Sequence, residues 1–118
     1  MRDLAPDITR QRLLIEGYYD TTVDKDTIRR FLAHLPTSLN LRTYGEATVH
    51  APSGAGQDAN EGFDAFVPLI DSGISLYVWT SRRFLALVLF TCKEFETDEA
   101  VRVTRDFFSM TDNAELSF

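Results

Sequence analysis

The alternation of apolar and polar residues predicts a series of strands. One apolar run, at 11–19, predicts a strand, and a second strand with a break at Gly45 is predicted at 39–49. Three further strands are predicted in quick succession at 63–70, 74–79 and 84–92. The links between them, at Ser72-Gly73 and at 81–83, are short, so these three strands are expected to be antiparallel neighbours.

Two segments have the spacing of amphipathic helices. The first follows capping residues at 20–24, has apolar residues at 28, 31, 32 and 35, and is expected to end at Pro36. The second begins at Thr97, where two acidic residues follow the cap, and it carries apolar residues at 101, 107 and 108. Residues 51–62, rich in Gly, Ser, Asn and Asp, predict a mobile loop. Residues 1–11 predict a loose leader before a single domain at 12–118.

This order predicts an α+β two-layer sandwich, an antiparallel sheet with two helices on one face. In the strand at 84–92 the side chains of both faces are apolar: Phe84, Ala86 and Val88 alternate with Leu85 and Leu87. The face away from the helices is therefore expected to be covered as well. A second subunit would cover it, which predicts a homodimer, and a curled sheet around one large core is the alternative.

Composition excludes several classes of function. The net charge of −6 and the pI near 4.8 disfavour nucleic-acid binding, and no apolar run reaches the roughly 18 residues of a membrane span. The single cysteine cannot form an internal disulfide, and nothing in the sequence requires a metal. The chain is expected to be cytoplasmic.

Asp71-Ser72 and the lone Cys92 carry the chemistry that the sequence suggests. A serine at the end of a strand can attack the carbonyl before it and shift the chain from amide to ester, after which elimination leaves a pyruvoyl group. That group is an electron sink made from protein alone. An Asp-Ser-Gly run is also an ordinary tight turn, and a cysteine on an alternating strand is often a packed core residue, so both readings stay open.

Three motifs resemble the small bacterial and archaeal S-adenosylmethionine decarboxylases over roughly 12–108. Residues 71–75 stand where that family has Glu-Ser-His-x-Ser, 76–81 stand for the segment with His-Thr-Trp-Pro-Glu, and Phe90-Thr91-Cys92 matches directly. The resemblance implies the S-adenosylmethionine decarboxylase-like fold and a cleavage between Asp71 and Ser72. It also implies that Ser72 becomes the pyruvoyl group that forms a Schiff base with the substrate amine. Cys92 would return a proton to the α-carbon, and Trp79 would lie near the ligand.

Four positions depart from the family pattern or match it loosely. Tyr77 replaces a histidine that assists self-processing, and a phenol normally keeps its proton at neutral pH. Asp64 replaces a second processing residue, a serine, and Ser81 replaces an acid that contacts the substrate. His50 lies near the position of a family histidine that precedes the binding loop.

Three functions are compatible with these residues. The first is binding of S-adenosylmethionine or a related amine or amino acid with self-cleavage impaired or lost, including a role as the regulatory partner of an active decarboxylase paralogue. The second is an active pyruvoyl-dependent decarboxylase of polyamine biosynthesis, acting on S-adenosylmethionine or a basic amino acid. The third is a non-catalytic dimerisation or interaction module. The cofactor is a pyruvoyl group from Ser72 if the chain is processed, and otherwise none.

Overall fold

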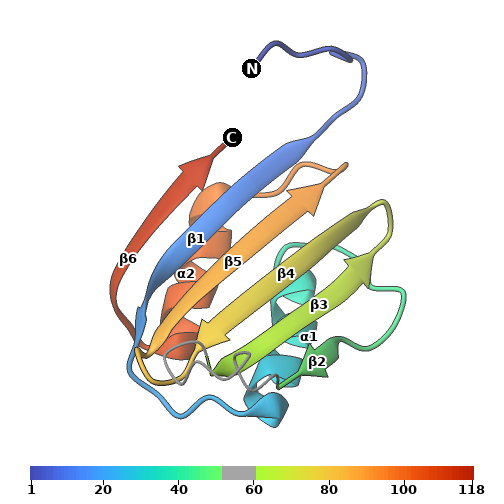
Figure 1. Ribbon diagram of the computed structural model, residues 1–118. Helices are drawn as coiled ribbons and strands as arrows, with labels where there is room; N and C mark the ends of the chain where they lie inside the picture. The colour runs from blue at the N-terminus through green and yellow to red at the C-terminus, as the bar shows by residue number, and fades with distance from the viewer. Residues whose placement is uncertain (52–60) are drawn as a thin grey trace.

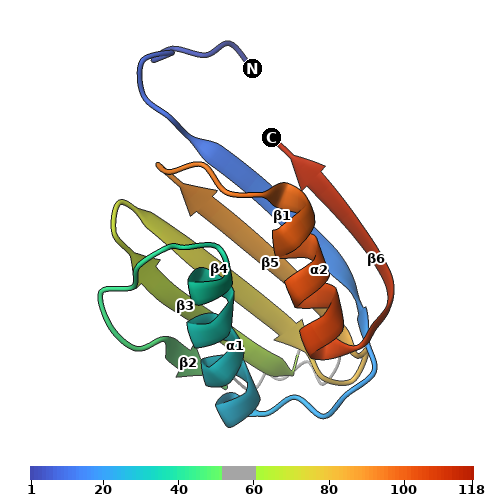
Figure 2. The same ribbon diagram turned by 180° about the vertical axis from the view of Figure 1, so that it is seen from behind.

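The computed structural model describes residues 1–51 and 61–118 as one six-stranded antiparallel sheet and two helices. The strand order is β2-β3-β4-β5-β1-β6. Both described helices lie side by side on one face of the sheet, and neither lies on the other face, called the open face below (Figures 1 and 2). The predicted α+β two-layer sandwich is thus confirmed. The elements are β1 (Gln11–Tyr19), α1 (Lys25–Ser38), β2 (Thr48–His50), β3 (Gly62–Leu69), β4 (Ser72–Trp79), β5 (Phe84–Thr91), α2 (Thr97–Phe108) and β6 (Met110–Ser117).

The hydrophobic core lies between the sheet and the helices. Along each strand alternate residues face the helices, and on β5 Leu85, Leu87 and Leu89 are fully buried there. On α1 the apolar residues at helical spacing are buried against this layer. The ring centroids of Phe31 and Phe108 lie 4.6 Å apart, which joins the two helices.

Pro36 does not end the first helix. The helix α1 continues to Ser38 although Pro36 has no backbone N–H to donate to the carbonyl of Leu32. The backbone bonds after it persist, because the Leu39 N–H donates to the Leu35 carbonyl over 3.2 Å. The hydroxyl of Thr37 donates to the carbonyl of Ala33 over 3.1 Å, and that of Ser38 donates to His34 over 3.0 Å. The prediction that the helix stops at Pro36 was therefore wrong by two residues.

The strand predicted at 39–49 is largely absent. Only Thr48–His50 forms a strand there, while Leu39 caps α1 and Thr43 makes an isolated bridge with Leu69. The strand β6 was missed because its residues are mostly polar, and it is held as an edge strand by pairing with β1. The loop predicted at 51–62 falls mainly on residues 52–60, which lie outside the described residues. Of the described helices, neither is long and apolar enough to cross a membrane.

Asp24 caps α1, which gives a first testable prediction. Its carboxylate accepts the backbone N–H of Thr27 over 2.8 Å and the Thr27 hydroxyl over 2.9 Å, and the backbone bond is the main cause that lowers the pKa of Asp24 below its ordinary 3.8. A lowered folded-state pKa adds stability above the ordinary value, and this is lost as the pH falls through the folded value. We expect Asp24→Ala to melt at a lower temperature than the unaltered chain at pH 7, with the difference shrinking towards pH 3.

Thermal melts followed by circular dichroism would measure this difference. Asp24→Asn is the matched control, because asparagine caps helices about as well as aspartate but does not titrate. A gap between the unaltered chain and Asp24→Ala that stays constant down to pH 3 would contradict the assignment.

Candidate functional site

The β3–β4 hairpin places Ser72 at the first position of a strand. Leu69 pairs with Ser72, so the turn consists of Ile70 and Asp71 rather than the predicted Ser72-Gly73. Asp71 has φ 58°, in the left-handed region that aspartate tolerates better than most residues. The peptide bond before Ser72 therefore follows a residue in a sparsely populated conformation, which stores backbone strain at the point of the hypothesised cleavage.

Gly73 lies inside β4, paired with Pro68 and Phe90, and the ring of Phe66 occupies the space beside it. A Cβ atom at Gly73 would come within 2.8 Å of the Phe66 ring. The resembling family has a histidine at this position, and in this chain the volume is taken by an aromatic ring on the neighbouring strand.

Cys92 lies beside Ser72. The register of β4 and β5, with Gly73 opposite Phe90, brings the end of β5 next to the start of β4. The backbone N–H of Cys92 donates to Ser72 Oγ over 3.1 Å. Ser72 is half-buried and Cys92 is exposed. The serine and the cysteine that the sequence singled out are thus within one hydrogen bond of each other.

A second group of candidate residues forms a row on the open face. Asp64 pairs directly with Tyr77 on the neighbouring strand, and His50 pairs with Asp64 on the strand beyond. We call these three residues the His50–Asp64–Tyr77 row. Tyr77 is five residues from Ser72, so at about 3.4 Å per residue the two lie roughly 17 Å apart along β4. Within one chain the row cannot contact the Ser72 hydroxyl.

Trp79 and Ser81 lie still farther from Ser72, at the other end of β4. The Trp79 ring packs on Phe84 with 5.6 Å between ring centroids, and its carbonyl accepts the Tyr19 hydroxyl over 3.5 Å. Ser81 is exposed in the turn that leads to β5. The structure therefore divides the sequence candidates between the two ends of the β4 strand.

Two cavities border the Ser72 corner. One, of about 390 Å³, lies on the open face and is lined by Phe66, Asp71, Ser72, Gly73, Ser75, Val88 and Phe90. The other, of about 330 Å³, is called the Cys92 cavity below and is lined by Asn40, Leu41, Arg42, Ile70, Asp71, Cys92 and Lys93. The sequence analysis missed the cations of the Cys92 cavity. Lys93 could have been found because it follows Cys92, whereas Arg42 belongs to the segment that was predicted as a strand and is largely irregular.

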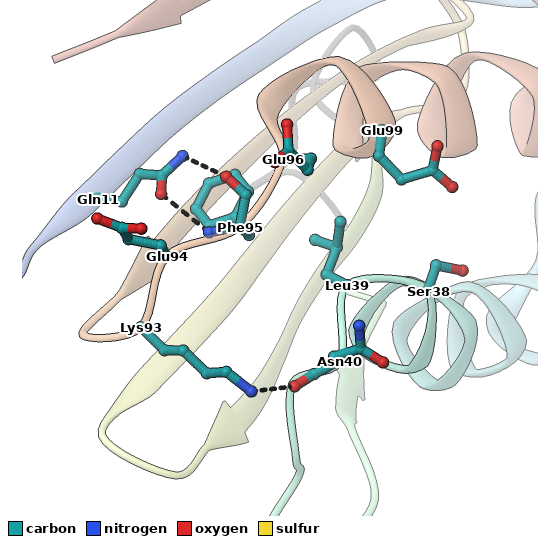
Figure 3. Close-up of a pocket in the computed structure, with 9 residues that line it drawn as sticks. All are labelled: Gln11, Ser38, Leu39, Asn40, Lys93, Glu94, Phe95, Glu96 and Glu99. Atoms are coloured by element: carbon teal, nitrogen blue, oxygen red, sulfur yellow. Dashed lines mark hydrogen bonds between the residues drawn. The ribbon is translucent and has the colours of Figure 1, made fainter.

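A larger cavity of about 470 Å³ adjoins the Cys92 cavity and shares Asn40 and Lys93 with it (Figure 3). The Lys93 ammonium donates to the Asn40 carbonyl over 2.8 Å. The Gln11 side chain donates to the Phe95 carbonyl over 2.9 Å and accepts the Phe95 N–H over 3.0 Å. This pair of bonds fixes the segment that follows Cys92 against β1. Among the described residues no group of three or more His, Cys, Asp or Glu side chains is arranged to hold a metal.

Comparison with known proteins assigns the family. Residues 12–115 match the family described as S-adenosylmethionine decarboxylase, which is most of the chain. The chain belongs to the S-adenosylmethionine decarboxylase family. The crystal structure of the adenosylmethionine decarboxylase from Aquifex aeolicus VF5 has the same fold, with a TM-score of 0.67 at 17% identity, and the alignment covers 94% of this chain and 89% of that chain. A search of the curated proteins found no match.

The S-adenosylmethionine decarboxylase family depends in general on a pyruvoyl group, so the Ser72 corner can be tested for its fit to that group. The strained Asp71 and the positioned Ser72 hydroxyl fit the precursor of such a group. What the Ser72 corner lacks for this role is a group that can accept a proton. Within the described part of the chain, the hydrogen-bond partner of Ser72 Oγ is the Cys92 N–H, which donates a proton and cannot accept one.

Proposed function

We propose that this member of the S-adenosylmethionine decarboxylase family binds S-adenosylmethionine or a related amine or amino acid, with self-cleavage at Ser72 impaired or lost. One observation carries the proposal: among the described residues, the hydrogen-bond partner of Ser72 Oγ is the Cys92 N–H, which cannot accept the proton of the Ser72 hydroxyl. A protein of this kind could act as the regulatory partner of an active decarboxylase paralogue.

Proton transfer is the step that the chain is poorly equipped to perform. The ester shift requires the Ser72 hydroxyl to give up a proton, and the elimination removes a second proton from its α-carbon. Tyr77 replaces the histidine of the family, and a phenol is a weak proton acceptor at neutral pH. The loss of a general base typically slows such a reaction by ~10²–10⁴.

The open-face cavity supports binding of a sulfonium or a protonated amine. Phe66 and Phe90 line it next to Ser72, and both rings are about two-fifths exposed. Aromatic faces attract cations, including onium groups. The negative net charge of the chain favours the same class of ligand.

A homodimer formed through the open face is part of the proposal. Large apolar side chains are exposed there on neighbouring strands, and such a contiguous surface is typical of an interface. They include Tyr18, Phe66, Tyr77, Phe90, Leu116 and Phe118. A two-fold axis running across the strands would set the His50–Asp64–Tyr77 row of each copy against the Ser72 end of the other.

An active pyruvoyl-dependent decarboxylase is the second candidate function. The presence of both Ser72 and Cys92, joined by one hydrogen bond, favours it, because a protein that only binds ligand has no chemical need for either residue. In this function the pyruvoyl group would withdraw electrons from the substrate as carbon dioxide leaves. Cys92 is held next to Ser72 by the bond from its backbone N–H, and its thiol would be the proton donor.

Intact-mass spectrometry of the freshly purified full chain tests the proposal against this second candidate. We expect the mass of the whole chain of 118 residues with Ser72 unmodified. A complete conversion to fragments 1–71 and 72–118, the latter with a blocked N-terminus, would overturn the proposed loss of cleavage and establish the second function.

Thermal-shift measurements test ligand binding by the intact chain. The panel contains S-adenosylmethionine, its decarboxylated product, arginine and ornithine. A ligand at about 100 times its Kd should stabilise the folded chain by ~2.7 kcal/mol, which appears as a rise in Tm. If no ligand raises the Tm, the binding function is wrong and an interaction module remains.

A further inference from the structure

We propose that the Cys92 cavity is a subsite for the zwitterionic head group of an α-amino acid, with Arg42 and Lys93 binding the carboxylate and Asp71 binding the ammonium. The inference rests on the proposed ligand-binding function and narrows it. The chain would select ligands that keep their carboxylate over the corresponding decarboxylated amines.

Three elements bring the charged residues of this cavity together. Asp71 is in the β3–β4 turn, Lys93 directly follows Cys92, and Arg42 comes from the segment after α1. That segment is tied to the turn, because the Ile70 N–H donates to the Arg42 carbonyl over 3.0 Å and the Tyr44 N–H donates to the Pro68 carbonyl over 3.1 Å. The backbone that carries Arg42 is therefore held next to Asp71.

The charges in the cavity match an amino acid rather than an amine. Two cations and one carboxylate line it, in a chain whose acidic residues outnumber its Lys and Arg residues by 18 to 12. An amine alone would be repelled by Arg42 and Lys93, whereas a neighbouring carboxylate would complement both cations. Lys93 donates one hydrogen bond to Asn40, and an ammonium has two further donors for a ligand.

The cavity also lies where such a head group is chemically useful. Cys92 lines it and donates its backbone N–H to Ser72, so a bound head group would lie next to the Ser72 corner. The rest of the ligand would extend out of the cavity. The charged residues of the cavity would bind the head group alone, so the ligand does not need an adenosyl group. The recognised class is therefore the α-amino acid in general.

Isothermal titration calorimetry on the full chain tests this subsite. The Ser72→Ala variant is used throughout, because it can neither cleave nor turn over a ligand and Ser72 does not line the Cys92 cavity. Two pairs of probes are compared: S-adenosylmethionine with its decarboxylated product, and ornithine with putrescine. We expect each amino acid to bind at least ~10-fold more tightly than its amine, with a preference that declines as salt is raised.

Arg42→Gln in the same background should remove most of this preference by weakening the amino acids ~10-fold, while the amines should bind no more weakly because one repelling charge is gone. Arg82→Gln is the matched control, since Arg82 is an exposed arginine in the turn at the other end of β4. Equal binding of amino acids and amines would overturn the subsite and leave the proposed function intact. The subsite would also be overturned if Arg42→Gln weakened amino acids and amines equally. The same holds if an equal concentration of acetate displaced ornithine. Absence of binding by every probe would overturn the proposed function together with the subsite.

Discussion

Replacing Tyr77 by histidine is expected to accelerate cleavage after Asp71 by ~10²–10⁴, because an imidazole can accept the proton that the phenol cannot. The Ser72 hydroxyl is already positioned by the Cys92 N–H, and Asp71 already holds the strained conformation, so a base is the missing component. Intact-mass spectrometry over hours to days after purification would give the rate for each variant.

Tyr18→His is the matched control for this substitution. Tyr18 is also an exposed tyrosine of the open face, on β1 instead of β4. It should leave the cleavage rate unchanged, as should Tyr77→Phe. A Tyr77→His chain that stays intact as long as the unaltered chain would show that the lack of a base is not what limits cleavage.

The same variant tests whether the base acts between copies. A chain with both Ser72→Ala and Tyr77→His cannot cleave itself, yet it carries the imidazole. Since roughly 17 Å separate positions 72 and 77 along one strand, we expect this chain to promote cleavage of the unaltered chain when the two are mixed and refolded together. Cleavage of the Tyr77→His chain alone, with none in the mixture, would mean that the imidazole reaches Ser72 within one chain.

Most of the fold could be predicted because local pattern and tertiary packing agree. On β5 alternate leucines are buried beneath the helices, and on α1 the apolar residues at 28, 31, 32 and 35 are all buried. The strand β6 could not be predicted, because its eight residues hold no regular apolar alternation and it exists through pairing with β1. The end of α1 was misplaced for a different reason, because Pro36 removes one backbone donor but leaves the backbone bonds of the residues after it in place.

The site could not be fully predicted because the position of the β3–β4 turn was predicted wrongly. A two-residue turn at Ser72-Gly73 would have paired Asp64 with Ser81, whereas the observed turn at Ile70-Asp71 pairs Asp64 with Tyr77. The sequence could not settle this, because Asp-Ser-Gly supplies turn residues at each position and the register depends on pairing along the whole of β3 and β4. The placement of Arg42 depends on backbone bonds to β3 that have no local signal.

Placing a charge at the centre of the open face is expected to convert the proposed homodimer to a monomer. Val88 lies on this face between Ser75 on β4 and Leu14 on β1. In the isolated chain an arginine there could extend into solvent, so the fold should persist. In a dimer formed through this face, Val88→Arg would bury an unpaired charge in each copy, which destabilises the dimer by several kcal/mol for each charge. Sedimentation velocity at micromolar concentration would measure the change in mass.

Ala33→Arg is the matched control, because it adds the same charge at an exposed position of α1 on the helical side of the molecule. It should leave the dimer intact, and circular dichroism should show both variants folded. Combining Val88→Arg with Tyr77→His connects the two predictions: if the imidazole acts on the Ser72 of another copy, the monomeric double variant should lose the accelerated cleavage. Accelerated cleavage in a folded, monomeric double variant would show that cleavage does not require contact between copies through the open face. A Val88→Arg chain that stays dimeric would show that the interface lies elsewhere.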